Sequence, residues 1–183
     1  MSREYADDDL PDVGEVSTGR VLVAGLSLAA GAMLVQETLM VLALRAPELL
    51  IVVAPLTVLF VLTAGLVIAL AVGRLTRNLS LRAASLTFFG AGFLAGALWG
   101  LPVFLVAVTT MAEAAGADPA RGAAVVGAIY LAAVAGVGAL VGRYFGPWAA
   151  TRPVLVRTVI ACVVVVAVTG LVLLTVVDLS ELT

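Results

Sequence analysis

Leu49–Val72 reads LLIVVAPLTVLFVLTAGLVIALAV, a run without a single charged side chain. A helix needs about 20 mainly apolar residues to cross the roughly 30 Å hydrocarbon layer of a bilayer, and this run is long enough. Charge bounds it on both sides, with Arg45 shortly before it and Gly73-Arg74 directly after it. The run therefore predicts a membrane-spanning helix.

Four other stretches have the same character, and they cover residues of about 21–44, 83–110, 123–141 and 156–177. Hydrophobic residues make up 63% of the 183-residue chain and charged residues 12%, so one soluble core could not bury the apolar side chains. We expect an all-α integral membrane bundle with five transmembrane helices over residues 20–178. An acidic tail of residues 1–19 and a short outer tail of residues 179–183 flank it.

The distribution of arginines predicts how the spans are oriented, because basic residues close to spans stay on the cytoplasmic side. With the N-terminus inside, only Arg45 and Arg121 of the ten basic residues fall on the outer side. The prediction is a multi-pass protein of the cell membrane with a cytoplasmic N-terminus and an outer C-terminus. The tail of residues 1–19 is rich in acids and is expected to be disordered, with docking to a basic partner as the alternative.

Missing residue types exclude several kinds of chemistry. The chain has no histidine, all of its basic residues are arginine, and it has one cysteine, Cys162. These absences exclude lysine Schiff bases, the P-loop, histidine-ligated haem, a Ser-His-Asp triad and an intramolecular disulfide. We expect a protein that is not an enzyme, with no cofactor and no metal. Nucleic acid is not an expected partner, because the arginines are spread along the membrane face.

Small residues recur at four-residue steps in the third and fourth spans. Helices in lipid associate through close packing of such residues, since apolar contact alone does not favour protein over lipid. The rows predict close helix contacts, either within the bundle or at a dimer face or pore lining. The predicted packing residues are Gly92, Gly96 and Gly100 in the third span and Ala128, Ala132 and Gly136 in the fourth.

Glu37 is the one carboxylate inside a predicted span, and Gln36 precedes it. An ionisable group within a span suggests a proton or cation site. Glu37 stands eight residues before Arg45, about 12 Å along a helix, which places it in the outer third of the membrane. Two interpretations stay open, an ion or substrate site and a structural polar contact that includes pairing with Arg45 or Arg121.

Gly100-Leu101-Pro102 predicts a kink or break in the outer half of the third span, because proline lacks the backbone donor and clashes with the preceding turn. Broken helices line substrate sites in transporters, which makes Pro102 a third candidate beside Glu37 and Gln36. Kinks also occur in membrane bundles that transport nothing.

Arginines and aromatic residues predict contacts with lipid headgroups on the cytoplasmic side. Most belong to a predicted loop that runs from Arg143 to Arg152, and the others follow the second span. The predicted interface residues are Arg74, Arg77, Arg143, Tyr144, Trp148 and Arg152.

Two classes of function agree with these features. The first is a non-enzymatic accessory or structural subunit of a membrane assembly. It is favoured because the spans hold few groups that could select a solute. The alternative is a small transporter or channel protomer that uses Glu37 and the Gly100 to Pro102 helix break. The expected partners are the lipid bilayer and either a second copy of the chain or a larger membrane protein.

Overall fold

The computed structural model describes residues 17–176, and all regular structure in that range is helical. Five helices are long and apolar enough to span a membrane, as expected, and the second of them, Pro47–Leu75, is made of several consecutive helical segments. Most of the predicted acidic tail and all of the predicted C-terminal tail lie outside the described residues. The elements are α1 Thr18–Ala43, the 3-10 turn η1 Pro47–Leu49, α2 Leu50–Phe60, the π-helical segment η2 Val61–Gly65, α3 Leu66–Leu75, α4 Leu81–Ala115, α5 Arg121–Ala150 and α6 Pro153–Val176.

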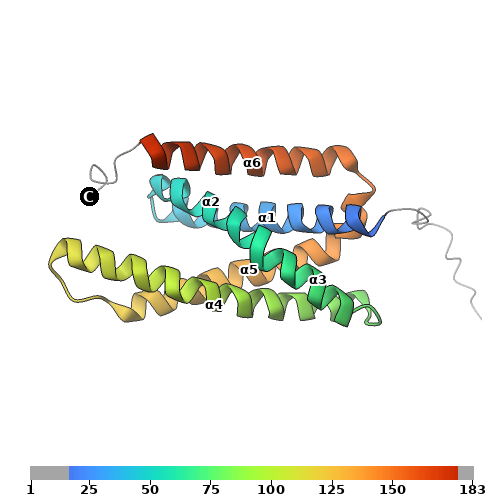
Figure 1. The fold of residues 1–183 in the computed structure, drawn as a ribbon, viewed down its shortest axis with the longest axis horizontal. Helices are drawn as coiled ribbons and strands as arrows, with labels where there is room; N and C mark the ends of the chain where they lie inside the picture. The colour runs from blue at the N-terminus through green and yellow to red at the C-terminus, as the bar shows by residue number, and fades with distance from the viewer. Residues whose placement is uncertain (1–16, 177–183) are drawn as a thin grey trace, which may run out of the picture.

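The five spans lie alongside one another and alternate in direction (Figure 1). The start of α1, the end of α3, the start of α4, the end of α5 and the start of α6 meet at one end of the bundle. We call it the arginine-rich end, because every described arginine except Arg45 and Arg121 belongs to it. Its arginines are Arg20, Arg74, Arg77, Arg82, Arg143, Arg152 and Arg157.

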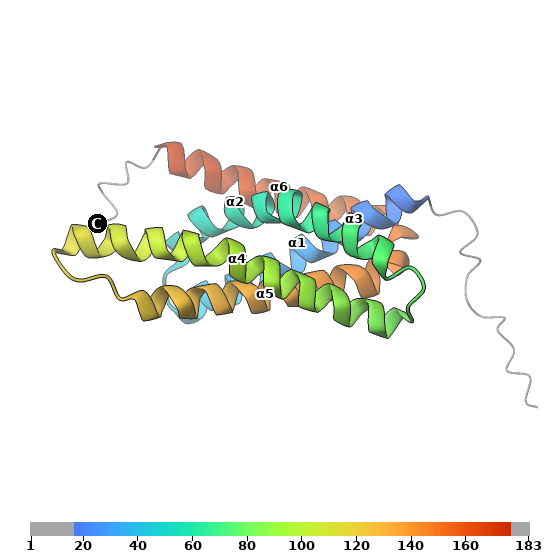
Figure 2. The same ribbon diagram turned by 60° about the horizontal axis from the view of Figure 1, so that its bottom comes forward.

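Helix α5 contacts both α4 and α1, and it runs alongside α4 (Figure 2), where the predicted glycine row lies against it. A methyl group built on Gly96 would lie 2.8 Å from Cα of Ala132. One built on Gly92 would lie 2.7 Å from the carbonyl oxygen of Ala135. These distances leave no room for a side chain on α4, so the row serves a contact within the bundle.

A second set of small residues joins α5 to α1. A methyl group on Gly142 would lie 2.5 Å from the carbonyl oxygen of Gly25, and one on Gly138 would lie 2.7 Å from Cγ of Met33. Gly136, predicted as a packing residue, instead faces α4, where it makes room for the ring of Phe89. The two faces of α5 thus hold three helices together by close backbone approach.

The prediction of a loop from Arg143 to Arg152 is wrong, because α5 continues to Ala150, past the predicted end of the fourth span at Val141. Gly142 and Gly146 both lie against Gly25 of α1. Pro147 stands in the last turn of α5, where its missing donor removes only one hydrogen bond. Packing against α1 thus keeps a glycine-containing stretch helical.

Of the kink or break predicted at Pro102, the break does not occur. Helix α4 runs without interruption from Leu81 to Ala115, with Pro102 inside it. One lost hydrogen bond is a small fraction of a 35-residue helix that packs along α5. The irregular backbone occurs instead in the second span, at the π-helical segment Val61–Gly65, which contains no proline.

Two helix ends have the same hydrogen-bond pattern with different residues. After α1, the amide of Ala46 donates to the carbonyl of Val41 at 3.1 Å. After α4, the amide of Ala117 donates to the carbonyl of Ala112 at 2.9 Å. Both are Schellman motifs, which require a residue with positive φ. Gly116 fills that position with φ 62°, whereas Arg45 fills the other with φ 56°.

Candidate functional site

Glu37 is buried between α1 and α2, with 3% of its surface exposed. The hydroxyl of Thr57 donates to Oε2 of Glu37 at 2.5 Å. The same hydroxyl lies 3.0 Å from the carbonyl oxygen of Val53. A hydroxyl carries one hydrogen, so it can donate to only one of these two acceptors at a time. Both contacts can be hydrogen bonds at once only if the carboxyl group is protonated and donates to the hydroxyl. The contact joins two adjacent helices through buried polar groups.

Gln36 does not extend this contact. Its side-chain amide donates to the carbonyl of Ala32 on its own helix at 3.0 Å. The hydroxyl of Tyr130 on α5 donates to the backbone carbonyl of Gln36 at 3.3 Å, which links a third helix to this level of the bundle. Of the three candidates from the sequence, only Glu37 is in a buried polar pair.

Neither predicted arginine partner nor Pro102 belongs to this site. Arg45 and Arg121 are exposed at the end of the bundle, whereas Glu37 is buried. Pro102 is exposed on α4. The partner of Glu37 is Thr57, which the sequence could have suggested: in a helical hairpin that turns near Pro47, residues 37 and 57 are equally far from the turn.

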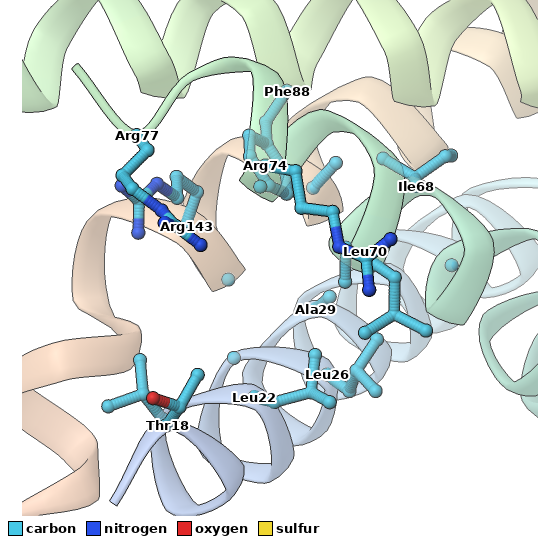
Figure 3. Close-up of a pocket in the computed structure, with 17 residues that line it drawn as sticks. Thr18, Leu22, Leu26, Ala29, Ile68, Leu70, Arg74, Arg77, Phe88 and Arg143 are labelled. Carbon is cyan, nitrogen blue, oxygen red and sulfur yellow. The ribbon is translucent and has the colours of Figure 1, made fainter. Parts of the chain in front are cut away.

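A pocket at the arginine-rich end is the second candidate site (Figure 3). It has a volume of about 540 Å³ and lies between α1, α3, α4 and α5. We call it the arginine pocket, because Arg74, Arg77 and Arg143 line it. These three residues were predicted at the lipid interface. The sequence did not predict the pocket, because its arginines come from separate elements that converge only in the folded bundle.

The other predicted interface residues lie on the last turns of α5 or directly after it, outside the arginine pocket. Tyr144 and Trp148 are 43% and 47% exposed. The guanidinium of Arg152 lies over the Trp148 ring, 4.3 Å from its centroid. This arrangement is typical of a cation–π pair near headgroups. Among residues 17–176, no group of three or more carboxylate or thiol side chains comes together to hold a metal.

Comparison with known proteins provides no family or function for this chain. No protein-family model matches the sequence, and neither a curated protein nor a solved structure is similar to it. The chemistry of the two sites is therefore the basis for any functional argument.

Proposed function

We propose that this multi-pass membrane protein is non-enzymatic and serves as an accessory or structural subunit of a larger membrane assembly. The observation that carries the proposal is the position of Glu37. Of the four carboxylates in residues 17–176, it alone is buried, and it lies against Thr57 between two helices. A carboxylate that couples ion movement must exchange with a water-filled path, and neither of the two cavities described for the bundle is lined by Glu37.

The test combines purification with a flux assay. The full-length protein, purified in mild detergent, is expected to bring with it a larger partner at fixed stoichiometry. In proteoliposomes, the wild type alone is expected to show no proton or cation flux above that of protein-free vesicles. A lone homo-oligomer that carries flux, with the flux abolished by Glu37→Gln and retained by Thr63→Val, would contradict the proposal.

The transporter alternative rests on one specific observation, the π-helical segment Val61–Gly65 in the second span. Single π-helical turns often occur at functional sites, and irregular helices in membranes line substrate paths. The segment begins four residues after Thr57, so a movement there would reach the Glu37 contact. The flux assay above distinguishes this alternative from the accessory role.

We also propose that the arginine-rich end faces the cytoplasm of the cell, as basic residues next to spans do. Single cysteines in a Cys162→Ala background test this orientation. Ala117→Cys, in the turn after α4, is expected to react with a membrane-impermeant maleimide on intact cells. Asn78→Cys, in the turn between α3 and α4, is expected to react only after permeabilisation. The reverse pattern would contradict the orientation.

A further inference from the structure

The arginine pocket brings positive charges together with no described acid among them. Arg77 and Arg143 lie at one edge of the pocket, and Arg74 reaches in from α3 near Leu70 (Figure 3). The four carboxylates of residues 17–176 are Glu37, Glu48, Glu113 and Asp118, and none of them lines the pocket. Guanidinium groups that line one pocket repel each other, so a bound anion would stabilise the arrangement.

Arg143 is the most constrained of the three arginines. Its guanidinium lies over the ring of Phe88, 5.7 Å from the centroid, which limits how far the side chain can move. Its Nε is buried and has no hydrogen-bond acceptor among the described residues. A buried donor without an acceptor is unfavourable, and a small movement of this side chain toward a bound anion would satisfy it. Arginine suits phosphate in particular, because its planar fork can donate two parallel hydrogen bonds.

The rest of the pocket is apolar. Leu22, Leu26 and Ala29 of α1 form one wall, and Ile68 and Leu70 of α3 form the other. The volume of about 540 Å³ is in the range of about 300–1,000 Å³ that is typical of small-molecule sites. It is large enough for a phosphate and the first part of a hydrocarbon chain. A ligand that suits both parts is anionic at one end and apolar at the other.

We infer that the arginine pocket binds one anionic phospholipid. Its phosphate contacts Arg74, Arg77 and Arg143, and the start of one acyl chain lies between α1 and α3. The pocket lies at the arginine-rich end, where we expect the arginines next to the spans to meet lipid headgroups, so a phospholipid could enter it without leaving the bilayer. A free phosphate would leave the apolar walls without a partner, which favours the lipid as the source of the phosphate.

The acidic residues before Ser17 offer a different anion, because Thr18 at the start of α1 lines the pocket. Carboxylates on a polar peptide match the arginines but not the apolar walls. The tail therefore fits the pocket less well than a phospholipid does, and its binding there is one outcome of the test.

The experiment measures lipid binding by the full-length protein in detergent, by native mass spectrometry and by thermal unfolding. The probes are dioleoylphosphatidylglycerol, dioleoylphosphatidylcholine and inorganic phosphate. The wild type is expected to retain one phosphatidylglycerol and to unfold at a higher temperature when it is added. Phosphatidylcholine and inorganic phosphate are expected to have little effect. Equal stabilisation by inorganic phosphate, or equal retention of phosphatidylcholine, would overturn the inference.

Paired arginine variants locate the binding site. Arg74→Gln with Arg77→Gln is expected to weaken phosphatidylglycerol binding by about 30-fold, the loss expected from two arginines near an anionic lipid. Both side chains are exposed, so the variant is expected to fold. The matched control, Arg152→Gln with Arg157→Gln, removes two arginines at the same end but outside the pocket. An equal loss in the control would overturn the inference, because it would show general headgroup attraction.

Two further variants test whether the acyl chain enters the pocket and whether the acidic tail occupies it. Gly73→Leu places a side chain into the pocket and is expected to abolish retention of phosphatidylglycerol while all three arginines remain. Unchanged retention would show that no acyl chain enters. Asp7→Asn with Asp8→Asn and Asp9→Asn is expected to change lipid affinity by about threefold or less, the size of a screened charge effect. A gain of about tenfold or more would identify the tail as the occupant and overturn the inference.

Discussion

Two rows of small residues with the same four-residue spacing have opposite surroundings. On α4, the row Gly92–Gly96–Gly100 packs directly against α5, and a methyl group on Gly96 would lie 2.8 Å from a backbone atom of α5. On the second span, Gly65, Ala69 and Gly73 line the arginine pocket. A methyl group on Gly73 would meet only the ring of Phe88, at 4.0 Å.

The difference shows that small residues permit close contact without enforcing it. The row on α4 faces Ala128, Ala132 and Ala135 of α5, so that both backbones can approach. The row on the second span faces a pocket whose α1 wall includes the larger side chains of Leu22 and Leu26. A sequence motif of this kind therefore predicts either a tight interface or a cavity, and the residues on the partner helix decide which.

The largest expected effect comes from adding the same side chain to both rows. Gly96→Leu is expected to lower the free energy of unfolding by about 3 kcal/mol, the upper part of the usual range for overpacking, because α5 cannot move away. Gly73→Leu is expected to change it by no more than about 0.5 kcal/mol, since the side chain enters an existing space. Thermal or denaturant unfolding in detergent measures both values. Equal losses for the two variants would remove the distinction between the rows.

A smaller effect is expected where α1 meets α2 through a polar contact rather than through glycine. Thr57→Val keeps the shape of the side chain but leaves the buried Glu37 carboxyl without its partner. We expect a loss of about 1–2 kcal/mol in the free energy of unfolding. Glu37→Leu combined with Thr57→Val is expected to recover much of that loss, because both buried groups are then apolar.

The full double-mutant cycle of Glu37 and Thr57 measures the coupling between them. Effects that simply add would show that the 2.5 Å contact contributes nothing to the stability of the bundle. Thr63→Val is a suitable control, since the Thr63 hydroxyl bonds only within its own span, to the carbonyls of Leu59 and Phe60.

The smallest expected effect concerns the two Schellman motifs. Arg45→Gly relieves a positive φ in a residue with a Cβ and is expected to raise the free energy of unfolding by about 0.5 kcal/mol, after the greater freedom of glycine in the unfolded chain is subtracted. Gly116→Ala is expected to lower it by about 1 kcal/mol. Chemical denaturation of the two variants beside the wild type measures both changes. A stabilising Gly116→Ala would contradict the backbone argument.

Much of the fold follows from the sequence, because length and apolarity alone determine which segments span a membrane. The five spans and the packing of Gly92, Gly96 and Gly100 within a helix pair were predictable for that reason. The errors have a common cause. Gly146 and Pro147 signal a turn in water, and Pro102 signals a break, but packing between long helices outweighs one or two missing hydrogen bonds.

The candidate sites were less predictable than the fold. Glu37 was evident as a lone carboxylate in a span, and counting from the turn near Pro47 would have led to Thr57. The arginine pocket could not be predicted, because topology explains Arg74, Arg77 and Arg143 individually. Only the convergence of α1, α3 and α5 places them around one cavity.

The π-helical segment of the second span has a geometric consequence for both sites. In a regular α-helix, the eight steps from Thr57 to Gly65 would leave the two residues about 80° apart around the axis. The wider π turn absorbs one extra residue and reduces that angle to about 20°. Both residues then face α1, Thr57 toward Glu37 and Gly65 toward Leu26.

The segment therefore sets how the two halves of one span are rotated relative to each other about the helix axis. The half before it is aligned to a polar partner on α1, and the half after it is aligned to the arginine pocket. If the same residues formed a regular α-helix throughout, α3 would be rotated by about 100° relative to α2. Arg74 would then swing away from the pocket while Thr57 stayed opposite Glu37. The wider turn thus keeps both halves of the span aligned to their partners, although the span holds one residue more than a uniform helix of that phase would need.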